Sequence, residues 1–247
     1  MLLPNERIDD LLVDDLKIVQ SKEVFSFSLD AVLLAHFCFV PKRGKVVDLC
    51  TGNGVIPLLL STRTAGMITG VEIQPRLLDM AVRSVQMNKL TGQIQLLCAD
   101  LRTVHCQLGF GEFDAVTVNP PYLSAKQTVW KNTNEHIARA RHEIDCTLDD
   151  VTAACSRLVK SGGKVTLVHR PGRLVEIIQS MKRVHLEPKR IRFVHPRAKE
   201  EANMVLIEAV KDGGSHVRLL PPMIVFEEGQ QYTAEMRGIL YGRAARN

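Results

Sequence analysis

Residues 113–122 of this 247-residue chain read FDAVTVNPPY. The run from Phe113 to Val118 is typical of a buried strand. Two consecutive prolines cannot continue a sheet, because neither donates a ladder hydrogen bond. The chain must therefore turn rigidly at the carboxyl end of this strand, where open α/β sheets place their chemistry. The turn offers the amide of Asn119, the carbonyl of Pro120 and the ring of Tyr122, a set that suits a planar substrate with an exocyclic amino group. The alternative is a stiff loop with an ordinary asparagine cap.

Short apolar strands alternate with helical patterns on both sides of this turn. This βαβ alternation predicts an α/β fold with a mostly parallel sheet and helices on both faces. Short strand segments are expected within residues 14–28, and a weaker strand and helix near 223–226 and 233–241. We expect the main strands near residues 45–49, 67–73, 94–98, 113–118, 163–169, 189–195 and 203–210. We expect the helices near residues 30–40, 53–62, 75–89, 148–159 and 171–183.

Acidic or glycine-rich turns follow the first three strands of this pattern. The first strand continues into Asp48-Leu49-Cys50-Thr51-Gly52-Asn53-Gly54, where two glycines permit a tight turn close to a ligand. Glu72 ends the second strand and could hold ribose hydroxyls, or could be a surface residue. Asp100 ends the third and could accept a hydrogen bond from an adenine amino group, or could cap a helix. Their ordered placement at successive strand ends favours a ligand site.

The composition excludes several classes of protein. With 45% hydrophobic and 24% charged residues, the chain is typical neither of a disordered protein nor of a membrane protein. No apolar run reaches the roughly 20 residues that span a bilayer, and the N-terminus lacks the pattern of a secretory signal. The six cysteines form no CxxC pair or zinc spacing, so we expect reduced thiols and no metal. The net charge of +5 is consistent with a polyanionic partner.

These motifs together resemble those of class I S-adenosylmethionine-dependent methyltransferases that methylate amino groups. The resemblance implies a Rossmann-like, doubly wound, mostly parallel seven-stranded sheet with S-adenosylmethionine as the cofactor. It implies one domain, with an N-terminal strand and helix extension over residues 1–43, a core over 44–211 and a C-terminal extension over 212–247. Cys50 stands where this family commonly has a glycine. The residues that match the catalytic turn are Asn119, Pro120, Pro121 and Tyr122.

A narrower resemblance comes from Phe25-Ser26-Phe27-Ser28-Leu29-Asp30 and the following Leu33-Leu34. This segment is similar to one in bacterial enzymes that methylate N6 of an adenine in the anticodon loop of a valine tRNA. It implies tRNA as the partner, no membrane association and a cytoplasmic location, and it leaves the oligomeric state open with a monomer favoured. The cofactor-binding residues that the resemblance implies are Phe27, Ser28, Asp30, Asp48, Cys50, Thr51, Gly52, Gly54, Glu72, Ile73, Asp100, Leu101 and Asn119.

The stretch after the catalytic turn, residues 123–146, is long, polar and basic. We expect it to contact RNA through Trp130, Arg139 and Arg141, with Tyr122 stacking on the target base. The alternative is a surface insertion without contact to substrate. His142 and Glu143 fit either a pair near the site or a plain helix start.

Other activities share the same catalytic turn. One alternative is N-methylation of a ribosomal RNA base. Another is methylation of a protein glutamine side chain, although those enzymes carry a sizeable helical domain and only some 40 residues precede the first core strand here. DNA methylation is less favoured, because no separate target-recognition domain is visible. A cofactor-binding RNA assembly factor without turnover is a different class, against which the intact catalytic turn argues.

Overall fold

A computed structural model describes residues 2–11, 15–21, 29–122 and 146–241. The strands are β1 (Glu6–Asp10), β2 (Lys17–Ser21), β3 (Lys45–Leu49), β4 (Met67–Glu72), β5 (Ile94–Cys98), β6 (Phe113–Val118), β7 (Val159–His169), β8 (Leu186–His195), β9 (Met204–Lys211), β10 (Arg218–Leu219) and β11 (Met223–Ile224). The helices are α1 (Leu29–Phe37), α2 (Val55–Ser61), α3 (Pro75–Met87), α4 (His105–Leu108), α6 (Leu148–Leu158), the 3-10 turn η2 (Pro171–Arg173), α7 (Leu174–Arg183) and α8 (Ala234–Tyr241).

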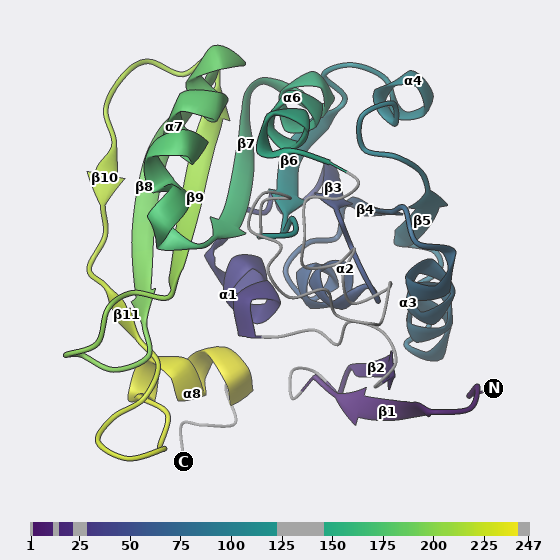
Figure 1. The fold of residues 1–247 in the computed structure, drawn as a ribbon. Coiled ribbons are helices and arrows are strands. Elements are labelled where there is room, and N and C mark those ends of the chain that lie inside the picture. Colours follow the sequence, from purple (N-terminus) through teal and green to yellow (C-terminus); the bar gives the residue numbers. More distant parts are fainter. Residues whose placement is uncertain (1, 12–14, 22–28, 123–145, 242–247) are drawn as a thin grey trace, which may run out of the picture.

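The central sheet has the order β10-β8-β9-β7-β6-β3-β4-β5, which runs from left to right in Figure 1. Strands β7, β6, β3, β4 and β5 are parallel, and β9 pairs antiparallel with both β7 and β8. The expected α/β fold with a mostly parallel sheet of seven long strands is therefore confirmed. The two-residue strands β10 and β11 add to this sheet beside β8.

Alternate residues of the inner strands enter two separate hydrophobic layers. In β3, Val46 packs in the layer that includes α1, α2 and α8, while Val47 packs in the layer of α6 and α7. Ala115 and Val116 of β6 divide in the same way. Both faces of the sheet are thus buried, as is usual for parallel sheets. Polar residues that bind a ligand are therefore expected at the strand ends. None of the helices in the described part of the chain has the length and apolar character needed to cross a bilayer.

Three details of the fold differ from the expected element boundaries. Strand β1 precedes the segment in which short strands were expected, and the chain from 22 to 28 lies outside the described residues. Strand β7 starts at Val159 rather than near 163. Its pairing with β6 shifts register between Phe113 and Ala115, and this irregularity accommodates Gly162 and Gly163, which resemble a turn in the sequence. Helix α4 was not expected, and its single turn carries no apolar periodicity.

The N-terminal hairpin of β1 and β2 is held against α3 by polar side chains of that helix. The Ser84 hydroxyl accepts from the Val19 backbone N–H at 3.0 Å. The Asn88 side chain accepts from the N–H of Lys17 at 3.0 Å and donates to its carbonyl at 2.6 Å, as a neighbouring strand would. Arg83 pairs with Glu6 at 2.6 Å, and this pairing lowers the pKa of Glu6. The hairpin therefore depends on α3 for bonds that the central sheet does not supply.

Ser84→Ala should lower the free energy of unfolding by about 1–3 kcal/mol, because it leaves the buried N–H of Val19 without an acceptor. Ser61→Ala is the control, since the Ser61 hydroxyl only donates to Leu58 within its own helix. That control should stay within about 0.5 kcal/mol of wild type. Denaturant unfolding of both variants makes the comparison, and equal losses would show that Ser84 does not anchor the hairpin.

Candidate functional site

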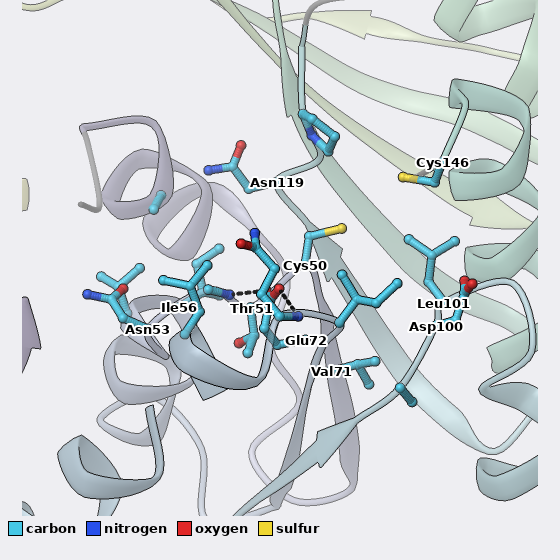
Figure 2. A pocket seen from close by; sticks show the side chains of 18 residues that line it. Cys50, Thr51, Asn53, Ile56, Val71, Glu72, Asp100, Leu101, Asn119 and Cys146 are labelled. Atoms are coloured by element: carbon cyan, nitrogen blue, oxygen red, sulfur yellow. Dashed lines mark hydrogen bonds between the residues drawn. The ribbon is translucent and has the colours of Figure 1, made fainter. Parts of the chain in front are cut away.

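A cavity lies at the carboxyl ends of β3, β4, β5 and β6, where the strand order reverses direction. Open α/β sheets bind ligands at such a switch point. Figure 2 shows the side chains around it, among them Cys50 after β3, Glu72 at the end of β4, Asp100 after β5 and Asn119 after β6. The residues that line it are Ala31, Cys50, Thr51, Gly52, Asn53, Val55, Ile56, Val71, Glu72, Ile73, Gln74, Leu77, Ala99, Asp100, Leu101, Asn119, Pro121 and Cys146.

The turn after β3 forms the floor of the cavity. Gly52 has a φ of 58° and Gly54 a φ of 89°, values at which side chains are strained. A Cβ on Gly54 would lie 3.1 Å from the Cβ of Ala81, so Gly54 does not line the cavity but lets α2 pack closely against α3. A Cβ on Gly52 would meet nothing within 4 Å, which leaves open space for a ligand. Cys50 also has a positive φ, of 57°, as the glycine common at this position would allow.

Glu72 joins the second strand to this turn. Its carboxylate accepts from the Gly52 N–H at 2.8 Å and from the Gln74 N–H at 2.9 Å. The side chain is 5% exposed and lines the cavity. A carboxylate has about four acceptor positions, so the two backbone bonds leave capacity for the hydroxyls of a ligand. The same bonds fix the shape of the glycine turn.

Asp100 lines the far side of the cavity, and Arg102 holds it. The Arg102 N–H donates to it at 2.9 Å, and the guanidinium pairs with the same carboxylate. Hydrogen bonds from that guanidinium lower the pKa of Asp100, so the group stays ionised and remains an acceptor. Leu101 and Ile73 line the cavity beside it and supply apolar surface for a planar ring.

Asp48 lies beneath the cavity and does not line it. It is completely buried and accepts from the Thr51 hydroxyl at 2.6 Å and the Thr117 hydroxyl at 2.7 Å. Burial raises the pKa of this carboxyl to about 7, against the two hydroxyl bonds that lower it. The side chain therefore ties the glycine turn after β3 to β6, whose end carries the catalytic turn.

The turn after β6 is fixed by a contact to α1. The Tyr122 hydroxyl lies 2.5 Å from Asp30 Oδ2 and 2.5 Å from Asn119 Oδ1. A phenol carries one proton, so it can donate to only one of these oxygens at a time. Burial and the Asp30 carboxylate raise the pKa of Tyr122 well above its usual range, which keeps that proton on the phenol. Asn119 and Pro121 line the cavity, whereas Pro120 and Tyr122 do not.

His169 and Arg170, at the end of β7, complete the surroundings of Tyr122. The His169 ring centroid lies 5.0 Å from that of Tyr122, and the Arg170 guanidinium lies 5.4 Å from the Tyr122 ring. Burial lowers the pKa of His169 to about 4, so the imidazole is neutral at pH 7. Its Nδ1 accepts from the Arg170 N–H at 2.8 Å, which puts the proton on Nε2. The ring on which a substrate base was expected to stack is thus already in contact with a cation.

The structure brings together most of the cofactor-site residues named from the sequence. Glycine-turn residues, Glu72, Asp100 and Asn119 meet in one cavity, while Asp30 lies beside it through Tyr122. The remaining named residues cannot be placed, because Phe27, Ser28, Trp130, Arg139 and Arg141 lie outside the described residues, as do His142 and Glu143. Their expected roles stay predictions.

Several lining residues were missed in the sequence. Asn53 lies between Gly52 and Gly54, the two glycines expected to bind the cofactor, and was not itself named. Its side chain donates to the Val19 carbonyl of the N-terminal hairpin at 3.1 Å. Cys146 reaches the cavity from the segment just before α6, and its free thiol lies beside that of Cys50. A hydrogen bond with the Cys146 thiol, together with burial, raises the pKa of Cys50 well above its usual range. No local signal could have paired two cysteines 96 positions apart. Among the described residues, no group of three or more His, Cys, Asp or Glu could hold a metal ion.

Comparison with known proteins adds to this geometry. The methyltransferase small domain family matches residues 15–171. The tRNA1(Val) (adenine(37)-N6)-methyltransferase of Photobacterium profundum is 24% identical over 211 residues, covering 84% of this chain and 86% of that protein. The enzyme of the same name in Bacteroides fragilis is 24% identical over 139 residues, and the match spans 56% of this chain and 57% of that protein.

A predicted O-methyltransferase from Agrobacterium tumefaciens, protein Atu636, has a similar solved structure. Its TM-score is 0.70 at 24% sequence identity, with 87% of this chain and 97% of that chain covered. At this identity the likeness shows the fold alone. It supports the order of strands and the position of the switch point, and it says nothing about the substrate.

Asp48→Asn should gain stability relative to wild type as the pH rises from about 4 to about 7. The folded state raises the pKa of Asp48 from 3.8 to about 7, so folding favours the protonated acid. Wild type therefore keeps this stability below pH 4 and loses it as the pH rises through 7, while the amide cannot ionise. Melting temperatures across this range test it, with Asp10→Asn at an exposed position as the control. A difference in melting temperature between Asp48→Asn and wild type that stays constant at every pH would contradict the raised pKa of Asp48.

Proposed function

Because this chain belongs to the methyltransferase small domain family, we propose that it methylates N6 of an adenine in tRNA. Its cofactor is S-adenosylmethionine. The relatives named as tRNA1(Val) adenine-N6 methyltransferases support the choice of substrate, which we narrow to the anticodon loop of a valine tRNA. A tRNA substrate also implies that the enzyme works in the cytoplasm.

The observation that carries this proposal is the position of Asn119. Its amide lines the cavity at the switch point, on a turn that two prolines and the Tyr122 hydroxyl hold in place. An adenine N6 nitrogen is a poor nucleophile, because its lone pair is delocalised into the ring. Asn119 Oδ1 lines the cavity, and the Pro120 carbonyl follows it on the same turn at the edge of the cavity lining. We propose that these two acceptors bond both N–H groups of the substrate and favour a more tetrahedral nitrogen. The lone pair is then available for attack.

Asp30 gives the proton of Tyr122 a second acceptor. Without substrate, Tyr122 can donate to either Asp30 or Asn119, which both lie 2.5 Å away. When an amino group approaches, the phenol can donate to Asp30 alone, and Asn119 Oδ1 is then free to accept from substrate. We propose that this exchange lets the catalytic amide be held rigidly before binding and released at binding. Holding the adenine nitrogen in line with the methyl group to be transferred is the kind of orientation that can lower a barrier by roughly 7–11 kcal/mol.

The cavity fits the cofactor by the chemistry of its residues. S-adenosylmethionine supplies an electrophilic methyl group on a sulfonium when it is bound. Glu72 is placed to accept from ribose hydroxyls, Asp100 from an adenine amino group, and the open space above Gly52 admits a ligand next to the backbone. Proton release after transfer requires no side chain with a shifted pKa, because the product ammonium can lose its proton to water.

The direct test is methyl transfer from labelled S-adenosylmethionine to tRNA, ribosomal RNA and protein from a strain that lacks this enzyme. We expect label in tRNA only, as N6-methyladenosine at one position in a valine isoacceptor. Label in ribosomal RNA or in protein glutamine instead would overturn the substrate assignment and leave the family assignment intact.

Glu72→Ala should weaken S-adenosylmethionine binding roughly 10- to 100-fold. The change removes charge-assisted hydrogen bonds, which contribute about 1.5–3 kcal/mol each, and releases the Gly52 and Gln74 N–H groups. Calorimetry measures the affinity. Glu201→Ala removes an exposed carboxylate elsewhere and should bind as wild type does. Unchanged affinity in Glu72→Ala would remove this residue from the site.

Asn119→Ala should lower kcat by more than tenfold, a barrier increase above about 1.4 kcal/mol, while the affinity for S-adenosylmethionine stays within a few-fold of wild type. The amide acts on the acceptor nitrogen, so its loss falls on the chemical step. Single-turnover rates with saturating tRNA isolate that step. A variant that keeps more than a tenth of the wild-type rate would exclude the proposed role.

A further inference from the structure

A second pocket lies away from the switch point, at the carboxyl end of α1. This groove has a volume of about 720 Å³ and is bounded by α1, β7, β8, β9 and β10. Five cationic side chains line it, against the single carboxylate of Glu208: Arg63, Lys164, Lys189, Arg190 and Arg218. Figure 1 shows β10, the strand that carries Arg218, at the outer edge of the sheet beyond β8. We name these residues the basic groove.

The floor of the basic groove is built around buried Glu208. Arg190 pairs with this carboxylate through two bonds, of 2.7 and 2.9 Å, and also donates to the Phe37 carbonyl at 3.1 Å. Glu208 accepts from the Phe39 N–H at 3.2 Å as well. One carboxylate therefore fixes both an arginine of β8 and the chain that leaves α1. The floor is organised before any ligand arrives.

The end of α1 would ordinarily repel an anion, because a helix C-terminus carries partial negative charge. Here two arginines cover that charge. Arg63 donates to the carbonyls of Ala35 and Cys38, and Arg190 donates to that of Phe37. The helix end is thus neutralised, and the remaining lysines and Arg218 set the potential of the groove.

The outer cations have few acidic partners. Within the described part of the chain, Lys189 and Arg218 form no ion pair, and Lys189 donates only to the Gly214 carbonyl. Lys164 lies 3.9 Å from Glu208 and 3.9 Å from the ring of Phe39, which is 39% exposed. Pockets for small molecules are lined mainly by apolar groups with a few polar ones. This lining, with spread cations and one aromatic rim, suits the phosphate backbone of a nucleic acid instead.

We infer that the basic groove binds backbone phosphates of the RNA substrate at a distance from the target base, an inference that rests on the proposed function. Lys164 and His169 are five positions apart in β7, and His169 contacts Tyr122. At about 3.3 Å per residue, the groove and the catalytic turn are about 17 Å apart along the strand. An A-form RNA duplex rises somewhat less per base pair than the roughly 3.4 Å of B-form DNA, so it covers that distance in about five to six pairs. One hairpin stem can therefore reach the groove while its loop delivers a base to Asn119.

The test compares two double variants of the full chain. Lys189→Gln with Arg218→Gln removes two outer cations of the basic groove. Lys17→Gln with Lys89→Gln removes two exposed cations beside α3, at the other end of the sheet, and is the matched control. Calorimetry with S-adenosylmethionine should give the wild-type affinity for both, which shows that the variants are folded.

Affinity for tRNA is then measured over a salt series. Each lost phosphate contact lowers the slope of log affinity against log salt by about 0.7–0.9. The groove variant should therefore lose about 1.4–1.8 in slope and show a several-fold higher KM at unchanged kcat. The control should overlap wild type. A groove variant with the wild-type slope, or a control that loses as much, would overturn the inference.

Stem length gives a second, independent readout. A hairpin with a stem of about two base pairs is too short to reach the groove, so wild type and the groove variant should bind it equally. With a stem of about eight base pairs the two should differ. If a free nucleotide at micromolar concentration displaces the long hairpin, the groove is a small-anion site and the inference fails. If the groove variant binds the long hairpin more weakly than wild type does, but wild type methylates no RNA, then the proposed function is wrong while the inference that the basic groove binds RNA still holds.

Discussion

The site depends on one buried carboxyl group. Asp48 lies at the point where the sheet reverses its strand order, and it binds the hydroxyl of Thr51 on one side and that of Thr117 on the other. Thr51 belongs to the glycine turn, and Thr117 belongs to the strand that ends in the catalytic turn. The part of the site that faces the cofactor and the part that faces the acceptor base are therefore fixed to each other through one side chain. Their relative position is therefore set by the protein itself and not by the ligands.

Two further contacts restrain the two parts of the site separately. Asp30 of α1 contacts the Tyr122 hydroxyl in the catalytic turn, and Glu72 of β4 accepts from the N–H of Gly52 in the glycine turn. Restraint of this kind costs no reorganisation at the moment of reaction, and this is how enzymes gain most from fixed polar groups.

The positions of the core strands were largely predictable, because buried parallel strands appear in the sequence as short apolar runs. The strands at 45–49, 94–98 and 113–118 form at the predicted residues, and Glu72 and Asp100 occupy the predicted strand ends. The direction in which the Asp48 side chain points from the sheet was not predictable. Both faces of a parallel sheet are buried, so its neighbours Val47 and Leu49 carry no alternation that would show which way the carboxyl points.

Contacts between distant segments were equally hidden. The contact of Cys50 with Cys146, the bond from Asn53 to Val19 and the placement of Arg190 under α1 depend on how elements pack, not on local sequence. The basic groove illustrates the same limit. Its cations come from the segment after α2 and from β7, β8 and β10, and only the fold brings them together. In the sequence they look like ordinary solvated charges.

The N-terminal hairpin has a consequence for how the chain is made. Its anchors to Ser84 and Asn88 span 65 and 71 positions, and its ion pair with Arg83 spans 77. The ribosome releases the hairpin well before α3, so none of these partners is outside the exit tunnel when the hairpin emerges. An isolated two-stranded hairpin is marginal in water, so β1 and β2 must wait while the next strands and helices assemble. The hairpin is thus made before the rest of this region and reaches its final place after it. Until it docks on α3, its unpaired strand edges are open to mispairing and to proteases.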